Sequence, residues 1–184
     1  TISQLSYIVL GGALATTAGV LGGGLHIAMH AVGKITLFFC AGAIMVGAHK
    51  TEISTMEGLG LKMPFTFGAF FLGSLSVIGL PPMGGSWSKW YLILGAAEAE
   101  QRIMMVVLMI SALLAIAYLV PVVARAFFRP PPAEGNHNPA PDDSSGIHEA
   151  PLLCVLPPVV TAVGCVALFF FADDVYRLLI GIVQ

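Results

Sequence analysis

The sequence predicts an all-α integral membrane protein, and three observations support this fold class. Of the 184 residues, 57% are hydrophobic and only 10% are charged, and the mean hydropathy is +0.90. Soluble domains carry about 25% charged residues, so a soluble fold would lack the polar surface that it needs. The apolar residues also form several runs that approach or exceed the roughly 20 residues of a transmembrane helix.

Turn signals divide these apolar runs into about five transmembrane helices. The triplet Gly22-Gly23-Gly24 is expected to form the turn between the first two. The expected helices cover about residues 5–21, 25–48, 64–80 with 86–97, 103–127 and 151–171, and an amphipathic interfacial tail covers residues 173–184.

The third of these helices is expected to be broken in its middle. The stretch from Pro64 to Ala97 is too long for one ordinary span, and it contains the run Leu80–Gly85, with sequence LPPMGG. Proline removes amide donors and glycine disfavours helix, so a continuous helix cannot pass through this run. The sequence therefore predicts two half-helices that together make one crossing.

Residues 129–150 are predicted to form a solvent-exposed linker, because they are rich in Pro, Asp, Ser and Asn. Asp142, Asp143 and Glu149 are expected to lie in this solvated segment. The chain is therefore expected to have three parts. These are a membrane region over residues 1–128, the linker, and a last helix with its tail over residues 151–184. Because the chain begins at Thr1, almost directly in an apolar run, we expect it to be part of a longer membrane protein.

The positive charges favour a cytoplasmic location for the N-terminal end of the chain and for the linker. If the loops alternate sides, four basic residues fall on that side and two on the other. The four are Lys50, Lys62, Arg125 and Arg129, and the two are Arg102 and Arg177.

Composition also bears on partners and cofactors. The net charge of −2 gives no basic bias, so nucleic acid is not an expected partner. Cys40, Cys154 and Cys165 lie in apolar runs without CxxC spacing, so we expect packing residues and neither a disulfide framework nor a zinc site. No flavin, nicotinamide, quinone or iron–sulfur motif is found. We therefore expect no cofactor in this chain, and any redox chemistry would lie in partner subunits.

A stripe of ionisable residues marks the second helix. His26, His30 and Lys34 are spaced by four residues, which places them along one face. Neighbours are roughly 6 Å apart along the axis, a distance that one water can bridge. Ionisable residues inside a span are costly and typically mark a transport path, so we predict a proton path. A purely structural role and a metal-binding HxxxH pair are the alternatives.

Lys89 is the second candidate, because it follows the Pro/Gly break in the run SWSKW. Irregular backbone at membrane depth must be buried in protein or line a wet cavity, and broken helices are where transporters place ion sites. The positive end of a helix dipole disfavours a lysine cation, so we expect Lys89 to gain and lose a proton. The alternative is a lysine that reaches the membrane interface beside Trp87 and Trp90.

Weaker candidates are other polar residues near helix ends. Gln4 and Tyr7 begin the first helix and are expected to satisfy its end. Tyr118 could face a channel, and Arg125 is expected to mark the membrane boundary.

Several ordered motifs make the sequence recognisable across nearly two-thirds of its length. They are Thr1–Tyr7 (TISQLSY), His26–Phe39 (HIAMHAVGKITLFF), Gly58-Leu59-Gly60, Met63-Pro64 and Gly79–Trp90 (GLPPMGGSWSKW). They resemble the proton-antiporter membrane family, which includes the antiporter-like subunits of proton-pumping NADH:quinone oxidoreductase (complex I) and the large subunits of Mrp-type Na⁺/H⁺ antiporters. The SKW form, together with the Pro-rich linker and Glu149-Ala150-Pro151, is most similar to the D subunit of Mrp antiporters.

The resemblance implies a fold and a function. Members contain two inverted repeats, each with a broken helix that carries a key ionisable residue, and this chain would be the C-terminal part, with most of the second repeat. Lys89 would match the ionisable residue at the exit of the proton route, and His26, His30 and Lys34 the polar axis that feeds it. The expected function is a proton half-channel in a cation/proton antiporter complex of the plasma (inner) membrane. A respiratory dehydrogenase or hydrogenase subunit, or a structural membrane scaffold, is the alternative. Implied partners are other membrane subunits, lipid, protons and Na⁺.

Overall fold

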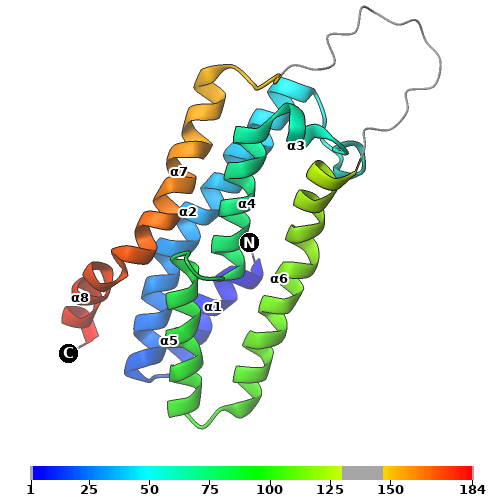
Figure 1. Cartoon of the computed structure of the whole chain (residues 1–184). Helices are drawn as coiled ribbons and strands as arrows, with labels where there is room; N and C mark the ends of the chain where they lie inside the picture. Colours follow the sequence, from blue (N-terminus) through cyan, green and yellow to red (C-terminus); the bar gives the residue numbers. More distant parts are fainter. Residues whose placement is uncertain (1, 130–146, 184) are drawn as a thin grey trace, which may run out of the picture.

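The computed structural model describes residues 2–129 and 147–183, which form a bundle of helices (Figure 1). The elements are α1 (Ile2–Ala13), α2 (Thr17–Ala48), a short 3-10 turn (Ile53–Thr55), α3 (Leu59–Lys62), α4 (Pro64–Ile78), α5 (Gly85–Glu98), α6 (Arg102–Phe128), α7 (Leu152–Phe170) and α8 (Ala172–Val183). The described part of the chain contains no strand. The predicted all-α fold class is confirmed.

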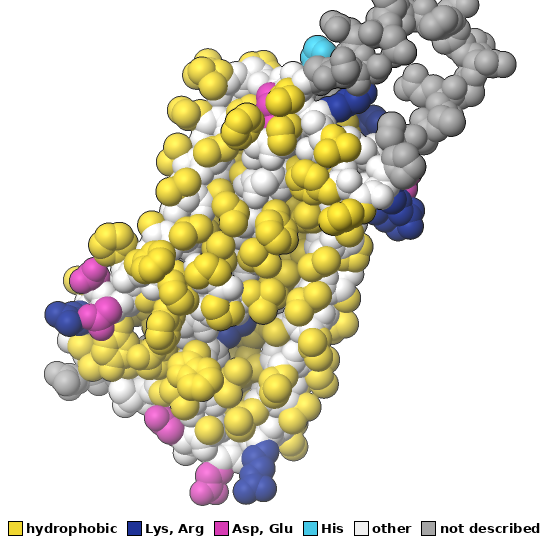
Figure 2. All heavy atoms as spheres, in the orientation of Figure 1, with side chains coloured by type: hydrophobic (Ala, Val, Ile, Leu, Met, Phe, Trp, Pro, Cys, Tyr) yellow, Lys and Arg dark blue, Asp and Glu magenta, His cyan; other side chains and the backbone are white. Residues whose placement is uncertain are grey.

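Length and surface chemistry are those of a multi-pass membrane protein. Within the described ranges, three helices are long and apolar enough to cross a membrane, namely α2, α6 and α7, and α1 and α4 are shorter apolar helices. Figure 2 shows mostly apolar side chains over the middle of the bundle, where one basic side chain is visible. The other charged side chains gather at its two ends and on α8. This arrangement fits an apolar belt between two polar boundaries.

The predicted break between residues 64 and 97 is confirmed. The two half-helices α4 and α5 follow one another along the bundle, and the chain between them turns at mid-height (Figure 1). Gly79 ends α4 in the left-handed conformation, with φ 87°, and its amide donates to the Leu75 carbonyl at 2.9 Å. A residue with a Cβ is strained at that φ, which explains the glycine at this helix end.

The expected turn at Gly22–Gly24 is wrong, because all three glycines lie inside the 32-residue α2. The true turn is earlier: Thr16 caps α2 by accepting the Gly19 amide at 3.1 Å. The expected helix over 5–21 therefore ends at Ala13. A Cβ on Gly22 would lie 2.7 Å from the Leu92 amide nitrogen, so glycine permits close packing of α2 on α5 where we expected a chain reversal.

The end of the expected linker is docked on the bundle. Residues 130–146, which include Asp142 and Asp143, lie outside the described residues. Glu149 was expected in this solvated segment, and it is half-exposed but bound to the bundle. Its carboxylate accepts the Phe65 amide at 2.7 Å and the Thr66 hydroxyl at 2.7 Å. An acidic group here satisfies free amides at the start of α4, which explains why it is held.

The amphipathic tail expected over residues 173–184 is the helix α8, which packs beside the first turns of α2. Leu179 lies against Gly24, and the rings of Tyr176 and Tyr91 stack with centroids 5.5 Å apart. Asp173 and Arg177 form an ion pair at 2.8 Å on its exposed side. The helix therefore covers the side of the bundle at which α5 meets α2.

Candidate functional site

Polar side chains from three helices meet inside the bundle at the level of the helix break. We call this set the polar cluster: Gln4 and Tyr7 of α1, His26 of α2, and Ser88 and Lys89 of α5. All are buried, with His26 3% exposed and Lys89 8% exposed. Burial of so many polar groups in an apolar bundle is costly unless they are hydrogen-bonded, so their partners decide what the cluster can do.

His26 has a partner at each ring nitrogen. Its Nδ1 lies 2.9 Å from the Ser88 hydroxyl, and its Nε2 lies 3.1 Å from the Gln4 side-chain oxygen. These contacts connect α2 to α5 on one side and to α1 on the other. The Gln4 oxygen only accepts a hydrogen bond, whereas the Ser88 hydroxyl can donate or accept one. The ring therefore keeps both contacts when it is neutral with its hydrogen on Nε2 and when it is charged.

His30 continues the stripe toward Lys34. Its ring stacks on that of His26, with centroids 5.7 Å apart and planes 4° apart. Its Nδ1 is buried and has no hydrogen-bond partner among the described residues. The Lys34 ammonium lies 4.8 Å from the centre of the Phe38 ring. The sequence spacing thus brings the two imidazoles face to face, and Lys34 lies one turn further along α2 without direct contact to Lys89.

Lys89 reaches back across the break. Its ammonium donates to the Val77 carbonyl at 3.0 Å and to the Ile78 carbonyl at 2.6 Å, and it lies 5.1 Å from the centre of the Tyr7 ring. We expected this lysine to feel the positive N-terminal end of α5. Its ammonium instead contacts the free carbonyls at the negative C-terminal end of α4, where a cation is stabilised. The dipole of α5 is therefore not what acts on the ammonium, because a lysine side chain is long enough to leave its own helix end. That Lys89 gains and loses a proton stays a prediction.

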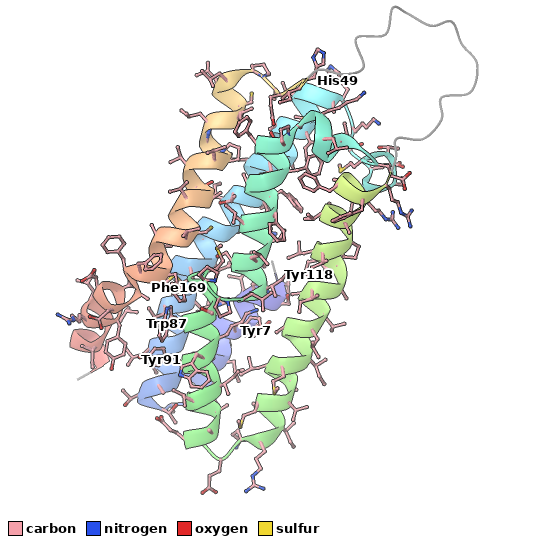
Figure 3. All side chains as sticks on the ribbon, viewed as in Figure 1. Tyr7, His49, Trp87, Tyr91, Tyr118 and Phe169 are labelled. Atoms are coloured by element: carbon pink, nitrogen blue, oxygen red, sulfur yellow. The ribbon has the colours of Figure 1, made fainter. Side chains whose placement is uncertain are left out.

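A hollow of about 400 Å³ adjoins Lys89 between α5 and α6. Tyr7, Ser86 and Lys89 supply its polar groups, and the remaining wall is almost entirely apolar. Figure 3 shows Tyr7 projecting near α5 below the break, and Trp87 packed with Phe169 on the opposite side. One face of Lys89 therefore borders an open space. A second hollow, of about 270 Å³, lies on the other side of α5, between Trp87, Tyr91 and Phe169.

The sequence did not identify three members of this cluster. Gln4 and Tyr7 were expected only to satisfy a helix end, and Ser88 received no role. Gln4 and Tyr7 are each 3% exposed, and their spacing of three residues places both on one face of α1. A polar pair on one face of an apolar helix was the available signal, but nothing local indicated that this face meets His26.

The metal alternative has little support in this geometry. Both ring nitrogens of His26 face Gln4 and Ser88, so the ring is not free to share an ion with His30. In the described ranges, no group of three or more His, Cys, Asp or Glu side chains is placed to hold a metal ion.

A bundle of apolar helices, interrupted at mid-height and lined there by buried ionisable side chains, defines an antiporter-like transmembrane domain. Residues 1–115 match the family described as NADH:quinone oxidoreductase/Mrp antiporter, transmembrane region. This match covers more than half of the chain, so the chain belongs to that family.

Relatives in the family include both respiratory and antiporter subunits. The chain is 36% identical over 178 residues to NADH-quinone oxidoreductase subunit N of Desulforudis audaxviator, covering 95% of this chain and 36% of that protein. It is 29% identical over 176 residues to the D subunit of the Na⁺/H⁺ antiporter of Alkalihalophilus pseudofirmus, covering 96% of this chain and 34% of that protein. The chain thus spans about a third of the length of these curated relatives.

Solved structures share the fold. A chain of the membrane-bound sulfane sulfur reductase, an archaeal respiratory membrane complex, superposes with a TM-score of 0.74 at 28% identity, covering 91% of this chain and 26% of that chain. A chain of respiratory complex I from Thermus thermophilus superposes with a TM-score of 0.58 at 20% identity, covering 95% and 43%. The second likeness concerns the fold alone.

Proposed function

We propose that this chain forms part of a proton-translocation route in an antiporter-like subunit of a larger membrane complex. The observation that carries the proposal is Lys89, a buried lysine at the break between α4 and α5. Its neighbour Ser88 contacts His26, so the break is connected to the ionisable stripe of α2.

The route would run from Lys34 through His30 and His26 to Lys89. The rings of His26 and His30 are stacked with centroids 5.7 Å apart, and Ser88 joins α2 to α5. Each group can change its protonation state, and a charge gained by one repels charge on the next in a low-dielectric interior. Such coupling would move protons stepwise along the stripe.

The sequence favours an Mrp-type monovalent cation/proton antiporter, similar to its D subunit. The identities support the respiratory alternative more strongly, at 36% to a respiratory subunit N against 29% to an antiporter's D subunit. We therefore propose the respiratory membrane subunit and the antiporter subunit as two candidates. In both cases the partners would be other membrane subunits, and the first residues of the chain would lie on the cytoplasmic side of a plasma (inner) membrane.

Single alanine substitutions at Lys34 and Lys89 test the proposal. They are introduced into the full-length protein within its native assembly, and proton transport is measured in vesicles. Lys50→Ala is the control, since Lys50 lies in a loop and donates to the Thr55 carbonyl. We expect a loss of transport in both test variants and parent-level transport in the control. Parent-level transport in both test variants would instead support a structural scaffold.

Transport with and without Na⁺ separates the two candidate complexes. Proton movement that requires a Na⁺ gradient would support the antiporter. Proton movement driven by an electron donor and acceptor pair without Na⁺ would support the respiratory subunit.

A further inference from the structure

Ser88 lies between two hydrogen-bond acceptors but can serve only one of them. Its hydroxyl oxygen is 2.9 Å from His26 Nδ1 and 3.0 Å from the Gly85 carbonyl oxygen. A serine hydroxyl has a single hydrogen. The side chain is fully buried, with 0% exposed, so solvent does not replace the bond that it gives up.

The protonation state of His26 decides which acceptor receives that hydrogen. When the ring is neutral with its hydrogen on Nε2, donated to Gln4, the Nδ1 atom is an acceptor and takes the Ser88 hydrogen. When Nδ1 gains a proton, it donates to the Ser88 oxygen, and the hydroxyl turns toward the Gly85 carbonyl. One proton is added to the ring, and the Ser88 hydrogen moves only by rotation about its bond.

The Gly85 carbonyl is the first of α5 and is directly connected to Lys89. In an α-helix the amide of residue i donates to the carbonyl of residue i−4. The Lys89 amide is therefore expected to donate its hydrogen bond to the Gly85 carbonyl. A carbonyl oxygen has two lone pairs and can accept both donors. Protonation of His26 therefore adds a second hydrogen bond to the Gly85 carbonyl, which also accepts the Lys89 amide in the first turn of α5.

We propose that Ser88 is a positioning residue of the proton route, whose hydroxyl transmits the protonation state of His26 to the helix break beside Lys89. This inference rests on the proposed function of the polar cluster and gives it a coupling element.

A substitution of Ser88 leaves the ionisable neighbours of the His26 ring unchanged. A change in the pH profile of transport can therefore be assigned to Ser88. The ionisable neighbours of His26 are Tyr7 on α1, with ring centroids 5.1 Å apart, His30 and then Lys34 on its own helix, and Lys89 on α5. Helix α4 carries no ionisable side chain, Cys165 of α7 contacts Thr36, and Tyr176 of α8 stacks on Tyr91.

The test compares Ser88→Ala with Ser88→Thr in the full-length assembly, with proton transport in vesicles followed as a function of pH. The alanine variant loses the switching hydrogen, so we expect a fall in rate of about 2- to 10-fold, the equivalent of one hydrogen bond. The pH of half-maximal transport is expected to move by about 0.5–1 unit, because the neutral and charged rings lose different bonds. The threonine variant keeps the hydroxyl and should resemble the parent. If it fails to assemble, Ser88→Cys, a weaker donor, should fall between parent and alanine.

Ser74→Ala is the matched control, since Ser74 is 1% exposed and its hydroxyl has no partner among the described residues. Its rate and pH profile should equal those of the parent. The inference is overturned if Ser88→Ala keeps the parental pH profile, whether its rate falls or not, or if the hydroxyl- or thiol-bearing variant matches alanine. Parent-level transport in Lys89→Ala would defeat the proposed function itself, whereas loss in Lys89→Ala with a parental Ser88→Ala defeats only this inference.

Discussion

The Lys89 ammonium lies 2.6 Å from the Ile78 carbonyl oxygen, so a side chain of α5 closes the end of α4. The two half-helices are therefore joined by a group that can gain or lose a proton. Loss of that proton removes the positive charge that the terminal carbonyls of α4 stabilise. In the proposed route, the break would couple protonation of Lys89 to the geometry of the two half-helices.

Lys89→Arg separates charge from proton release. Arginine keeps donors for the carbonyls of Val77 and Ile78, but its guanidinium does not deprotonate in proteins. We expect proton transport to fall on the order of tenfold or more, with the melting temperature close to that of the parent. Lys50→Arg in the exposed loop is the control. An active Lys89→Arg protein would show that only a fixed positive charge is needed.

Gln4→Ala should weaken the structure and the transport together. It leaves a His26 ring nitrogen without its partner inside the bundle, at a cost of about 1–3 kcal/mol. Thermal unfolding of the purified assembly measures the stability change. Ser3→Ala, on the exposed side of the same helix, should change it little. Equal stability for the two variants would mean that the contact between Gln4 and His26 contributes nothing.

Gly22→Ala tests the packing role of the glycine triplet. The new methyl group would meet the backbone of Leu92 at 2.7 Å, and overpacking of this kind costs about 1–3 kcal/mol. Gly42→Ala, also in α2, has nothing within 4 Å of the added Cβ and should be neutral or slightly stabilising. A tolerated Gly22→Ala would argue against close contact between α2 and α5.

Glu149→Ala should loosen the start of α4. Its carboxylate accepts the amides of Phe65 and Thr66 and the Thr66 hydroxyl, and loss of such a cap costs about 0.5–2 kcal/mol. Hydrogen exchange at these two amides should become faster. In Glu57→Ala, which removes an ion pair with the largely exposed Arg129, the same amides should exchange as in the parent.

Local signals predicted much of this fold. Hydropathy located the apolar helices, and the run from Leu80 to Gly85 located the break, because proline and glycine act within their own segment. Gly22–Gly24 misled the prediction. The choice between a glycine turn and a glycine contact depends on whether another helix approaches, and Leu92 is far away in the sequence.

Only the part of the candidate site whose residues lie close together in the sequence was predicted. His26 and His30 share a helix face, and the structure stacks their rings. The contacts of His26 with Gln4 and Ser88 join three helices, so no periodicity within one helix could reveal them. The direction of the Lys89 side chain was also beyond local reasoning, because it depends on the carbonyls of the preceding half-helix.

Proton transport by His26→Asn compared with His49→Asn tests the central claim most directly. Asparagine can still form hydrogen bonds but does not titrate. At position 49 it also tolerates the left-handed conformation, with φ 52°, that the native histidine adopts at the end of α2. In vesicles with the full-length assembly, we predict a loss on the order of tenfold or more for His26→Asn and parent-level transport for His49→Asn. Parent-level transport by both variants would contradict a proton route through the polar cluster.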